Sequence, residues 1–403
     1  MNKSVTELFS LQGYLVDKIE VKNGTSVVQC RSPRRFVACP TCGATTKKVH
    51  QKKYRLLRHG KMNRTKIVLR LAVRRMSCRG CRKVFTEALP GVSNKRSTDQ
   101  FYRFAFELLI NNSFRWTGKY CGISPSTLVK QLISLQTQWH IDWNAMGEEI
   151  ILGIDEHSFR GKRMVITITD LTNHKLLAVL KGDQQSYLEE FINSIPKTAQ
   201  KRIVEVCTDL RFSYRSVMER MLPPVRVVAD RYHVERQAKY TMDKIRAVIQ
   251  SNEPKKYQAK DIMMRYANQL NEAEQKRLHH IFLRYQQYPV LKEMWFIKEQ
   301  IRRIYFCGNK KDALRKFNHC LMLLETAHRS SYITDLKHTL RRWQEQILNY
   351  YDRRTTNGFT EGCHTKIKLI KRTSFGFRNI NNYIAKITLA FLPLLYILNH
   401  HTI

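Results

Sequence analysis

Three patterns of apolar and polar residues follow one another along the chain. The first, in residues 1–92, is short and basic, and apolar and polar side chains alternate in stretches such as Ser26–Cys30 and Lys66–Val73. Alternation with a period of two is typical of strands that expose one face and bury the other. This part of the chain therefore predicts a small β-rich module.

The second pattern has the spacing of an amphipathic helix. From Thr98 to about Trp139 apolar residues recur at helical spacing, and the segment Gly122–Thr127 interrupts them. After the interruption, Ser124 can cap a new helix that has Pro125 at its first position. We therefore predict a helix-turn-helix domain in residues 93–146.

The third pattern begins at residue 147 and consists of strands separated by helices. Its first strand is a nearly unbroken apolar run of the kind that is buried on both faces of a sheet. The order βββαβαβ that follows is typical of an RNase-H-like core, which we place in residues 147–233. The expected strands are Glu149–Ile154, Met164–Thr169, Lys175–Leu180, Arg202–Thr208 and Val225–Ala229, and the expected helices are Gln184–Ser194 and Ser213–Met221.

Residues 234–350 are charged and helical in pattern, with few Gly or Pro residues and no strand-like alternation. They predict an all-helical insertion that separates the first part of the core from its C-terminal part, residues 351–403. That last part has a turn, a basic helix and then an apolar stretch, Ile387–Leu398. With 12 residues, this stretch is too short to span a bilayer and predicts a core helix.

The charge of the chain points to a polyanionic partner. Lys and Arg number 71 and Asp and Glu 33, which gives a net charge of +38 with neutral His. Such an excess makes a folded chain repel itself unless a polyanion neutralises it, and nucleic acid is the polyanion that fits best. Charge alone does not separate an enzyme from a protein that only coats RNA. Because no apolar run is of membrane-spanning length and Met1–Tyr14 lacks the order of a secretory signal, we expect a soluble cytoplasmic protein.

Four of the ten cysteines form two C-x-x-C pairs near the N-terminus, Cys39 with Cys42 and Cys78 with Cys81. A C-x-x-C pair in a tight turn lets both thiolates bind one tetrahedral ion, so the two pairs predict a structural Zn²⁺ site. A redox role fits poorly, because neither pair lies in a βαβ context. His50 and His59 are competing ligands. The six remaining cysteines are expected to be packing residues.

The second helix of the predicted helix-turn-helix begins with polar side chains, and the zinc module is crowded with basic ones. Their density suits contacts with the phosphates of a nucleic acid. The candidate DNA-binding residues in these two regions are Arg34, Arg35, Lys47, Lys48, Arg74, Arg75, Ser124, Ser126, Thr127 and Lys130.

Three carboxylates occupy the positions at which an RNase-H-like core keeps its catalytic acids. Such a core places one on the first strand, one at the end of the fourth strand and one on a C-terminal helix, and together they hold two divalent ions about 3.5 to 4 Å apart. Asp155 directly follows the apolar run that ends at Ile154, Asp209 ends the fourth strand, and Glu361 opens a helix after a turn. We therefore predict that Asp155, Asp209 and Glu361 are catalytic and bind Mg²⁺ or Mn²⁺.

The second of these positions has a rival. Asp230 ends the fifth strand, but the fourth strand lies beside the first in this fold, and this order favours Asp209. Asp170 and Asp183 are weaker rivals, and Glu156 is either an auxiliary ligand or a surface charge. Taken singly, each carboxylate is as easily explained as a helix cap or a strand-end charge; their order and placement together favour a metal site.

Several motifs resemble those of the ISL-three family of bacterial insertion-sequence transposases, and the resemblance extends over nearly the whole chain. The paired cysteines near the N-terminus also fit this family. The motifs are Gly153–Ser158 (GIDEHS), Ala229–Val234 (ADRYHV), Asn357–Gly362 (NGFTEG), Lys366–Arg372 (KIKLIKR) and Phe375–Asn379 (FGFRN).

The resemblance implies a DDE transposase that cuts and joins DNA at the terminal inverted repeats of its own element with Mg²⁺, and whose N-terminal modules recognise those ends. Carried over by position, the triad falls on Asp155, Asp209 and Glu361, although Asp230 is also distinctive of the family. For Tyr232 and His233, a packed pair and a role in handling the flanking strand both remain open. The basic residues after Glu361 would hold phosphates of the cut end or form a solvated face: Lys366, Lys368, Lys371, Arg372 and Arg378.

The predicted fold is thus α/β and multidomain, with a zinc-binding β module, a helix-turn-helix and an RNase-H-like catalytic core that an all-helical insertion interrupts. The expected partners are double-stranded DNA, as inverted repeats and as target, and a second copy of the chain that helps to synapse two ends; no membrane is expected. The family implies a bacterial, nucleoid-associated location. Two alternatives are a DNA-binding regulator derived from a transposase, which the presence of all three carboxylates disfavours, and a structured-RNA nuclease, which the helix-turn-helix disfavours.

Overall fold

The computed structural model falls into two compact units, which we describe one at a time. The first contains residues 1–140 and 367–403, and the second contains residues 141–366. No described helix combines the length and the apolar character that crossing a membrane requires. The structure describes residues 11, 13–62, 65–92, 96–252, 254 and 259–392.

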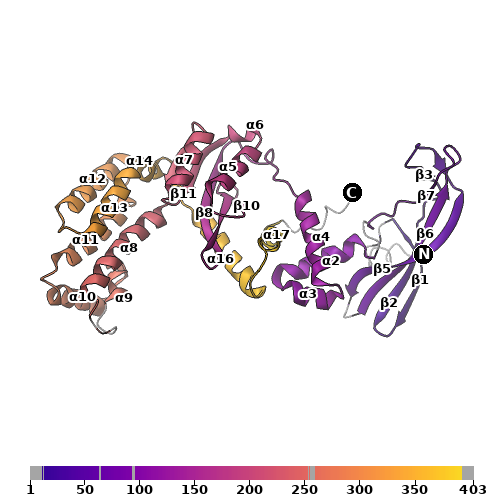
Figure 1. Cartoon of the computed structure of the whole chain (residues 1–403), viewed down its shortest axis with the longest axis horizontal. Helices are drawn as coiled ribbons and strands as arrows, with labels where there is room; N and C mark the ends of the chain where they lie inside the picture. Colours follow the sequence, from indigo (N-terminus) through magenta and orange to yellow (C-terminus); the bar gives the residue numbers. More distant parts are fainter. Residues whose placement is uncertain are drawn as a thin grey trace. The chain divides into compact units, whose positions relative to one another are not determined.

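The N-terminal part of the first unit is a five-stranded sheet, as the alternating pattern predicts (Figure 1). Its strands follow the order β1-β2-β6-β5, and β7 pairs with the last residues of β6, Arg75–Ser77. Val28, Leu57 and Leu69 are among the inward side chains of its core. The strands are β1 (Leu15–Lys22), β2 (Thr25–Arg31), β5 (Val49–Met62), β6 (Thr65–Ser77) and β7 (Val84–Thr86), and a separate pair is formed by β3 (Val37–Ala38) and β4 (Thr45–Thr46).

Four helices accompany this sheet among the described residues of the first unit. Ser124 caps α4 with its side chain and Pro125 starts the helix, as the sequence predicts, while Gly122 ends α3 in the left-handed conformation with φ 69°. The apolar face of α17 packs with α2 and α4, through residues such as Ala385 and Leu389. The helices are α2 (Asp99–Asn111), α3 (Phe114–Cys121), α4 (Pro125–Gln138) and α17 (Ile380–Phe391). The expected apolar tail overlaps α17, but its residues 393–398 lie outside the described part of the chain.

The second unit has a mixed five-stranded sheet whose elements follow the predicted order (Figure 1). The strand order is β10-β9-β8-β11-β12, in which β8, β9 and β10 are antiparallel neighbours while β11 and β12 run parallel to β8. Helices α5 and α7 share one core with the sheet through Leu188, Tyr214 and Val217. The elements are β8 (Ile150–Arg160), β9 (Arg163–Asp170), β10 (Lys175–Val179), α5 (Gln185–Ser194), α6 (Lys197–Gln200), β11 (Ile203–Thr208), α7 (Phe212–Met221) and β12 (Arg226–Ala229).

A long run of helices follows β12, and no strand occurs among the described residues of the predicted insertion. These helices form one core that includes Cys207 and Val228 of the sheet together with Met294, Phe317 and Trp343. They are α8 (Arg231–Ile249), α9 (Lys260–Met263), the 3-10 helix η2 (Ala267–Gln269), α10 (Glu272–Arg284), α11 (Pro289–Ile304), α12 (Lys310–Thr326), α13 (Ser331–Arg342), α14 (Gln344–Leu348) and α15 (Tyr350–Arg353), after which comes α16 (Gly358–Thr373).

Candidate functional site

The four paired cysteines come together in the N-terminal module. The sulfur atoms of Cys39 and Cys81 lie 3.6 Å apart, and those of Cys42 and Cys78 lie 3.5 Å apart. None of the four forms a disulfide, and all four sulfurs lie within 4.8 Å of one another. Four thiolates about 2.3 Å from one tetrahedral ion must be separated by roughly these distances. The cluster therefore fits a structural Zn²⁺ and has no place for a substrate.

The competing histidine ligands are not part of this cluster, which consists of the four cysteines. His59 is buried, and its Nδ1 lies 2.9 Å from Oγ1 of Thr98. Of the six remaining cysteines, all are free thiols and Cys307 is the most accessible, while the other five are buried. The expectation that they are packing residues is thus met by these five.

Strand register aligns three aspartates at one edge of the second sheet. In the parallel pair β8–β11, Ile154 pairs with Thr208, and in the pair β11–β12, Thr208 pairs with Ala229. The next residue on each strand is Asp155, Asp209 or Asp230. The three carboxylates thus stand in one row. The expected end of the first strand at Ile154 is wrong, because β8 continues to Arg160 by pairing with β9 beyond the reach of β11.

Asn357 attaches the start of α16 to this row. Its Nδ2 donates to the carbonyl of Ile154 at 3.0 Å, and its backbone N–H donates to Oδ1 of Asp230 at 3.0 Å. Its Oδ1 accepts a hydrogen bond from Thr360 at 2.5 Å. Because Asn357 is buried and joins two strands to the helix, it brings Glu361, in the first turn of α16, to the aspartates.

Gly153 makes this close approach feasible. A Cβ atom at this position would lie 2.5 Å from Oγ1 of Thr169 and from Oγ1 of Thr360, and it would also meet Oδ1 of Asn357. Real Cβ atoms do not tolerate such contacts without a shift of the neighbouring groups. The glycine of the GIDEHS motif therefore provides the space in which the two threonine hydroxyls, 2.6 Å apart, join β9 to α16.

Two histidines flank Asp155. His233 Nε2 lies 3.6 Å from Asp155 Oδ1, and His364 Nδ1 lies 3.4 Å from Asp155 Oδ2. The other nitrogen of His364 lies 3.0 Å from Oγ1 of Thr167, which also contacts Nδ1 of His157 at 2.8 Å. Asp155 is therefore held between the beginnings of α8 and α16.

Sequence reasoning gave neither histidine a role as a neighbour of the carboxylates. The signal was present, because His233 follows Asp230 by three residues and His364 follows Glu361 by three residues. On a helix this spacing places two side chains on one face. Ligand atoms of Asp230, His233 and Glu361 all lie within 4.8 Å of one another.

Burial and mutual repulsion disfavour the charged forms of these aspartates. The pKa of Asp155 rises from 3.8 to about 7, first because of burial and then because Asp209, Asp230 and Glu361 repel it, while the N–H of Glu156 opposes the rise. Such repulsion is what a cluster of carboxylates without a counterion should show.

The neighbouring groups show the same effect. Burial, with repulsion from Glu361 and Asp209, raises the pKa of Asp230 to about 6. Burial also raises the pKa of Asp209, although the positive charges of Arg211 and Arg236 oppose the rise.

The donor atoms of this cluster fit a divalent cation. Asp230 Oδ2 is buried and accepts no hydrogen bond within the described part of the chain. Buried polar atoms are usually hydrogen-bonded, so this oxygen, which has only His233 Nε2 at 3.9 Å opposite it, is available to a cation. Carboxylate oxygens suit Mg²⁺ and Mn²⁺, whose charge would also offset the repulsion among the four carboxylates.

Glu156, the residue after Asp155, points to a different set of partners. Arg211 Nη1 lies 2.5 Å from its Oε1, and the hydroxyl of Tyr214 donates to it. Arg211 also pairs with Asp183 at 3.3 Å. The structure therefore places Glu156 and Asp183 in a network that links β8 to α7, where Arg211 neutralises them.

A pocket of about 360 Å³ opens next to Asp209. Its other walls are formed by residues of the β11–α7 connection and of α8, including Arg211, His233, Arg236 and Tyr240. Arg211 is already paired with Glu156 and Asp183, so Arg236 is the arginine whose positive charge faces Asp209 across this pocket without such a pair in the residues that the structure describes.

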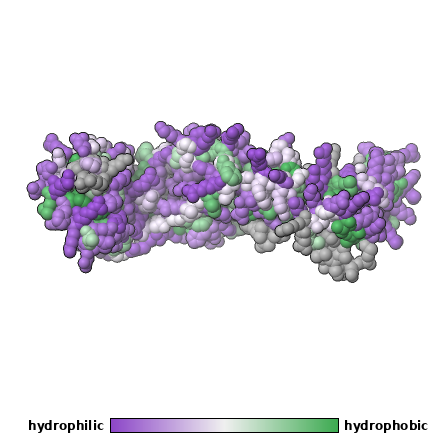
Figure 2. Space-filling view, turned by 90° about the horizontal axis from the view of Figure 1, so that it is seen from below, coloured by the Kyte–Doolittle hydropathy of each residue, from purple (hydrophilic) through white to green (hydrophobic). Residues whose placement is uncertain are grey.

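The predicted DNA-binding residues are mostly exposed, and hydrophilic residues cover most of the face seen in Figure 2. Arg74 is an exception, because its guanidinium binds Glu87 at 2.6 Å and the carbonyl of Arg34 at 2.8 Å. Ser124 is occupied as the cap of α4, where its Oγ accepts from the N–H of Thr127 at 3.1 Å. Lys366, Lys368, Lys371 and Arg372 lie on α16, and Arg378 lies in the segment that follows it.

Two family models match this chain. One, described as a transposase, matches residues 152–387, and the other, described as the zinc-finger of transposase IS204/IS1001/IS1096/IS1165, matches residues 35–81. A curated relative, the transposase for insertion sequence element IS1001 of Bordetella parapertussis, is 23% identical over 408 residues, which cover 96% of this chain and 98% of the relative. Since the first match alone covers more than half of the chain, the chain belongs to the ISL-three family of transposases.

Proposed function

We propose that this chain is a DDE-type DNA transposase that binds the terminal inverted repeats of its insertion sequence and catalyses Mg²⁺-dependent DNA cleavage and strand transfer. The observation that carries the proposal is that strand register and the hydrogen bonds of Asn357 bring Asp155, Asp209 and Glu361 to one edge of the sheet, although the helical insertion separates Glu361 from the aspartates along the chain. Membership of a transposase family supplies the substrate class.

The strand order supports an RNase-H-like core. Three antiparallel strands are followed by two strands parallel to the first, and β11 is the direct neighbour of β8. Because β11 lies directly beside β8, we assign the second metal position to Asp209 rather than to Asp230. Asp230 is nevertheless closer to Glu361 and His233, so its part in the cluster needs its own test.

The reaction begins with attack of water on a phosphodiester at the element end. The freed 3′-hydroxyl then attacks a phosphodiester of the target DNA, so that one P–O bond forms as another breaks. Two divalent ions held by Asp155, Asp209 and Glu361 would activate the attacking oxygen and stabilise the leaving one. The chain itself orients the carboxylates through Asn357, and the pocket beside Asp209 leaves room for the attacking water and the phosphodiester.

The N-terminal modules would hold the DNA. The zinc cluster fixes a short, strongly basic module, and the capped helix α4 after the turn at Gly122 has the arrangement of a recognition helix in a helix-turn-helix. Exposed cations such as Arg35, Lys47 and Arg75 suit phosphate contacts. Because two element ends must be joined, we propose that the active form contains at least two copies of the chain.

The test is cleavage of DNA that carries the inverted repeats, whose sequence can be read from the DNA flanking the gene. Replacement of Asp155, Asp209 or Glu361 by Ala should reduce Mg²⁺-dependent cleavage by at least about 10³-fold, because each carboxylate holds charge that develops in the transition state. DNA affinity should change little. The control is Asp335→Ala, an exposed aspartate on α13, which should cleave like the wild type.

The rival position is tested in the same assay with isosteric variants. We expect Asp209→Asn to abolish cleavage and Asp230→Asn to retain a measurable part of it. The opposite ranking would assign the second metal position to Asp230. Full activity of any variant of Asp155, Asp209 or Glu361 would refute the role of that residue.

A further inference from the structure

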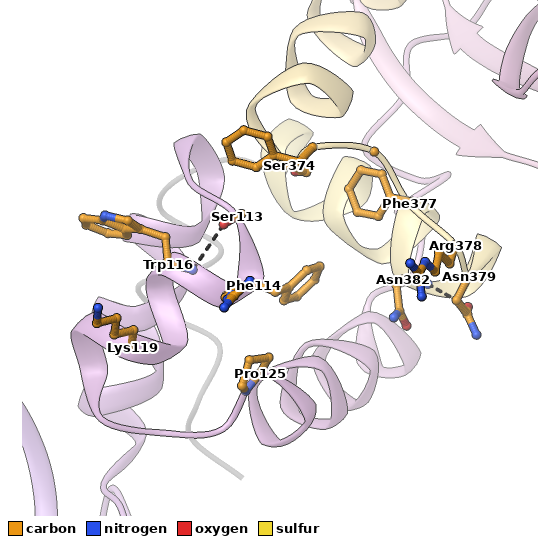
Figure 3. A pocket seen from close by; sticks show the side chains of 13 residues that line it. Ser113, Phe114, Trp116, Lys119, Pro125, Ser374, Phe377, Arg378, Asn379 and Asn382 are labelled. Atoms are coloured by element: carbon orange, nitrogen blue, oxygen red, sulfur yellow. Dashed lines mark hydrogen bonds between the residues drawn. The ribbon is translucent and has the colours of Figure 1, made fainter.

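A pocket of about 770 Å³ lies within the first unit, whose residues include none of the candidate metal-binding carboxylates. One wall is α3, which contributes Phe114, Trp116 and Lys119, and the other is the segment between α16 and α17, which contributes Phe375, Phe377 and Arg378. Figure 3 shows Phe114 and Trp116 on one side of the space and Phe377 and Arg378 on the other. Its volume is in the range of pockets that bind small organic groups.

The walls of this pocket are fixed by packing. Phe377 packs edge-on against the buried Tyr383 at 5.2 Å between ring centroids. The ammonium of Lys386 is buried, donates to the carbonyl of Asn112 and lies 5.7 Å from the centre of the Phe114 ring. These contacts attach the segment before α17 to α2 and α3, so the pocket is part of the fold of this unit.

Phe375 lies in the turn that ends α16, where its N–H donates to the carbonyl of Arg372 at 3.0 Å and the N–H of Gly376 donates to the carbonyl of Lys371 at 2.9 Å. Its φ is 57°, in the left-handed region that usually takes Gly or Asn at the end of a helix. Its side chain is 92% exposed, so it buries almost no apolar surface in return. The helix end fixes the backbone here but does not require an aromatic side chain, so an exposed ring in the lining of a pocket indicates a surface that a ligand completes.

The pocket is lined by cations and aromatic rings, and this combination indicates the class of ligand. Among the described residues that line the pocket are three cations, Arg115, Lys119 and Arg378, and no acidic residue. Trp116 is 46% exposed and stacks on Tyr120 at 5.1 Å, so the outer face of its indole is available to a flat group. Aromatic faces next to cations bind bases together with their phosphates.

We propose that this pocket binds an unpaired nucleobase of the DNA, which stacks on Trp116 or Phe375 while Arg115, Lys119 and Arg378 hold the adjoining phosphates. A base inside a duplex has both faces covered, so only a base that has left the stack can enter. The inference rests on the proposed function only in taking DNA as the ligand. It adds a site for a distorted or opened end to the duplex grip of the N-terminal modules.

The experiment measures binding of three labelled duplexes to the full-length protein without Mg²⁺. One duplex is uninterrupted, one carries a single unpaired thymine, and one carries an abasic residue in place of that thymine. Wild type should bind the duplex with the unpaired thymine about tenfold more tightly than the abasic duplex, because the stacked base is the only difference between them. Phe375→Ala and Trp116→Ala should lower this preference to about two-fold or less.

Two further variants separate stacking from structure. Phe375→Trp keeps a ring at the exposed position and should retain the preference. Phe296→Ala removes a ring that is 45% exposed on α11 and should also retain it. Because Phe375 contributes almost no buried surface, its removal should leave the uninterrupted duplex bound as tightly as before.

The proposal is overturned if wild type does not distinguish the thymine from the abasic residue, or if both alanine variants keep the full preference. It is also overturned if Phe375→Ala changes the oligomeric state and leaves the preference intact, since the pocket would then be an interface between copies. Wild-type cleavage of inverted-repeat DNA with Mg²⁺ is measured in parallel. If wild type prefers the unpaired thymine but does not cleave the DNA, the proposed enzymatic activity is refuted and the base-binding pocket stands. If wild type cleaves the DNA but shows no preference for the thymine, the base-binding pocket is refuted and the enzymatic activity stands.

Discussion

The cysteine cluster and the carboxylate cluster are both groups of four potential ligands, but they are assembled in opposite ways. Each C-x-x-C pair is set by a tight turn, and the strands between the pairs lie in the same small module. The carboxylates come from three strands and a helix that the insertion separates from them, and Asn357 has to join the parts. The first site depends on local geometry, and the second depends on the whole fold of its unit.

The two clusters also differ in what they contribute to the stability of the fold. A structural zinc site contributes its binding free energy to folding. The carboxylates repel one another in a buried position, so without a cation they lower stability in order to keep a reactive arrangement. Replacing a cysteine of the first site should therefore destabilise the folded protein, whereas replacing a carboxylate of the second site should stabilise it when Mg²⁺ is absent.

The largest effect is expected for Cys39→Ser. Loss of one thiolate should release the zinc and unfold the module around residues 35–86, because metal binding contributes on the order of 10 kcal/mol to small zinc modules. The zinc content of the purified protein and amide exchange in β5 and β6 measure this, and exchange in β8 and β11 should be unchanged. Cys307→Ser, at a partly exposed thiol, is the control. Retention of one zinc per chain would contradict the prediction.

The second effect has the opposite sign and concerns Asp155→Asn in Mg²⁺-free protein. The folded pKa of Asp155 is about 7 and its ordinary value is 3.8, so the unfolded state loses this proton first. The carboxyl group therefore stabilises the fold fully only at low pH, and this contribution is lost as the pH rises through 7. Between about pH 5 and about pH 8, the unfolding free energy of wild type should fall by roughly 2 to 3 kcal/mol relative to that of the variant.

Urea denaturation of the two proteins at each pH measures this difference, and Asp335→Asn is the matched control. Addition of Mg²⁺ should reverse the sign by stabilising wild type more than the variant, since a ligand that binds the folded state stabilises it. A difference in unfolding free energy that does not depend on pH would show that the cluster is not under repulsion.

The smallest change in stability is expected for Gly153→Ala. The added methyl group collides with the hydroxyls of Thr169 and Thr360 and should cost about 1 to 3 kcal/mol of unfolding free energy. The cleavage rate should fall by more than the loss of stability explains, because the same contacts position Glu361. Gly147→Ala, where no atom lies within 4 Å of the new Cβ, should be neutral in both assays. Equal behaviour of the two variants would exclude a positioning role for the close approach at Gly153.

Most elements of the fold were predictable because their signals are local. Apolar runs followed by a charge marked β8, β11 and their aspartates, and a serine before a proline marked the start of α4. The match of predicted and observed elements extends to the helices after β12. The errors concern ends that depend on a neighbour, such as the continuation of β8 to Arg160 along β9.

The ligand environment was less predictable. His233 and His364 carry an i, i+3 signal, but that spacing is common on helices and does not say which face meets a carboxylate. Likewise, Arg74 belongs to a run of basic residues in the sequence, and only the fold brings Glu87 to it and makes it a structural partner. Charge density identifies a class of partner, and it does not say which cation is already neutralised.

The sequence by itself determined the paired cysteines and most of the order of strands and helices, and it predicted a polyanionic partner and three catalytic carboxylates, because each of these depends on spacing or composition over a short stretch. Tertiary structure alone decided that two histidines lie beside those carboxylates, that Asn357 connects Asp230 to Ile154 and α16, and that an exposed Phe375 completes a pocket with Trp116. The physical reason is that side-chain proximity across the chain follows from packing and strand register, which a linear pattern constrains but does not specify.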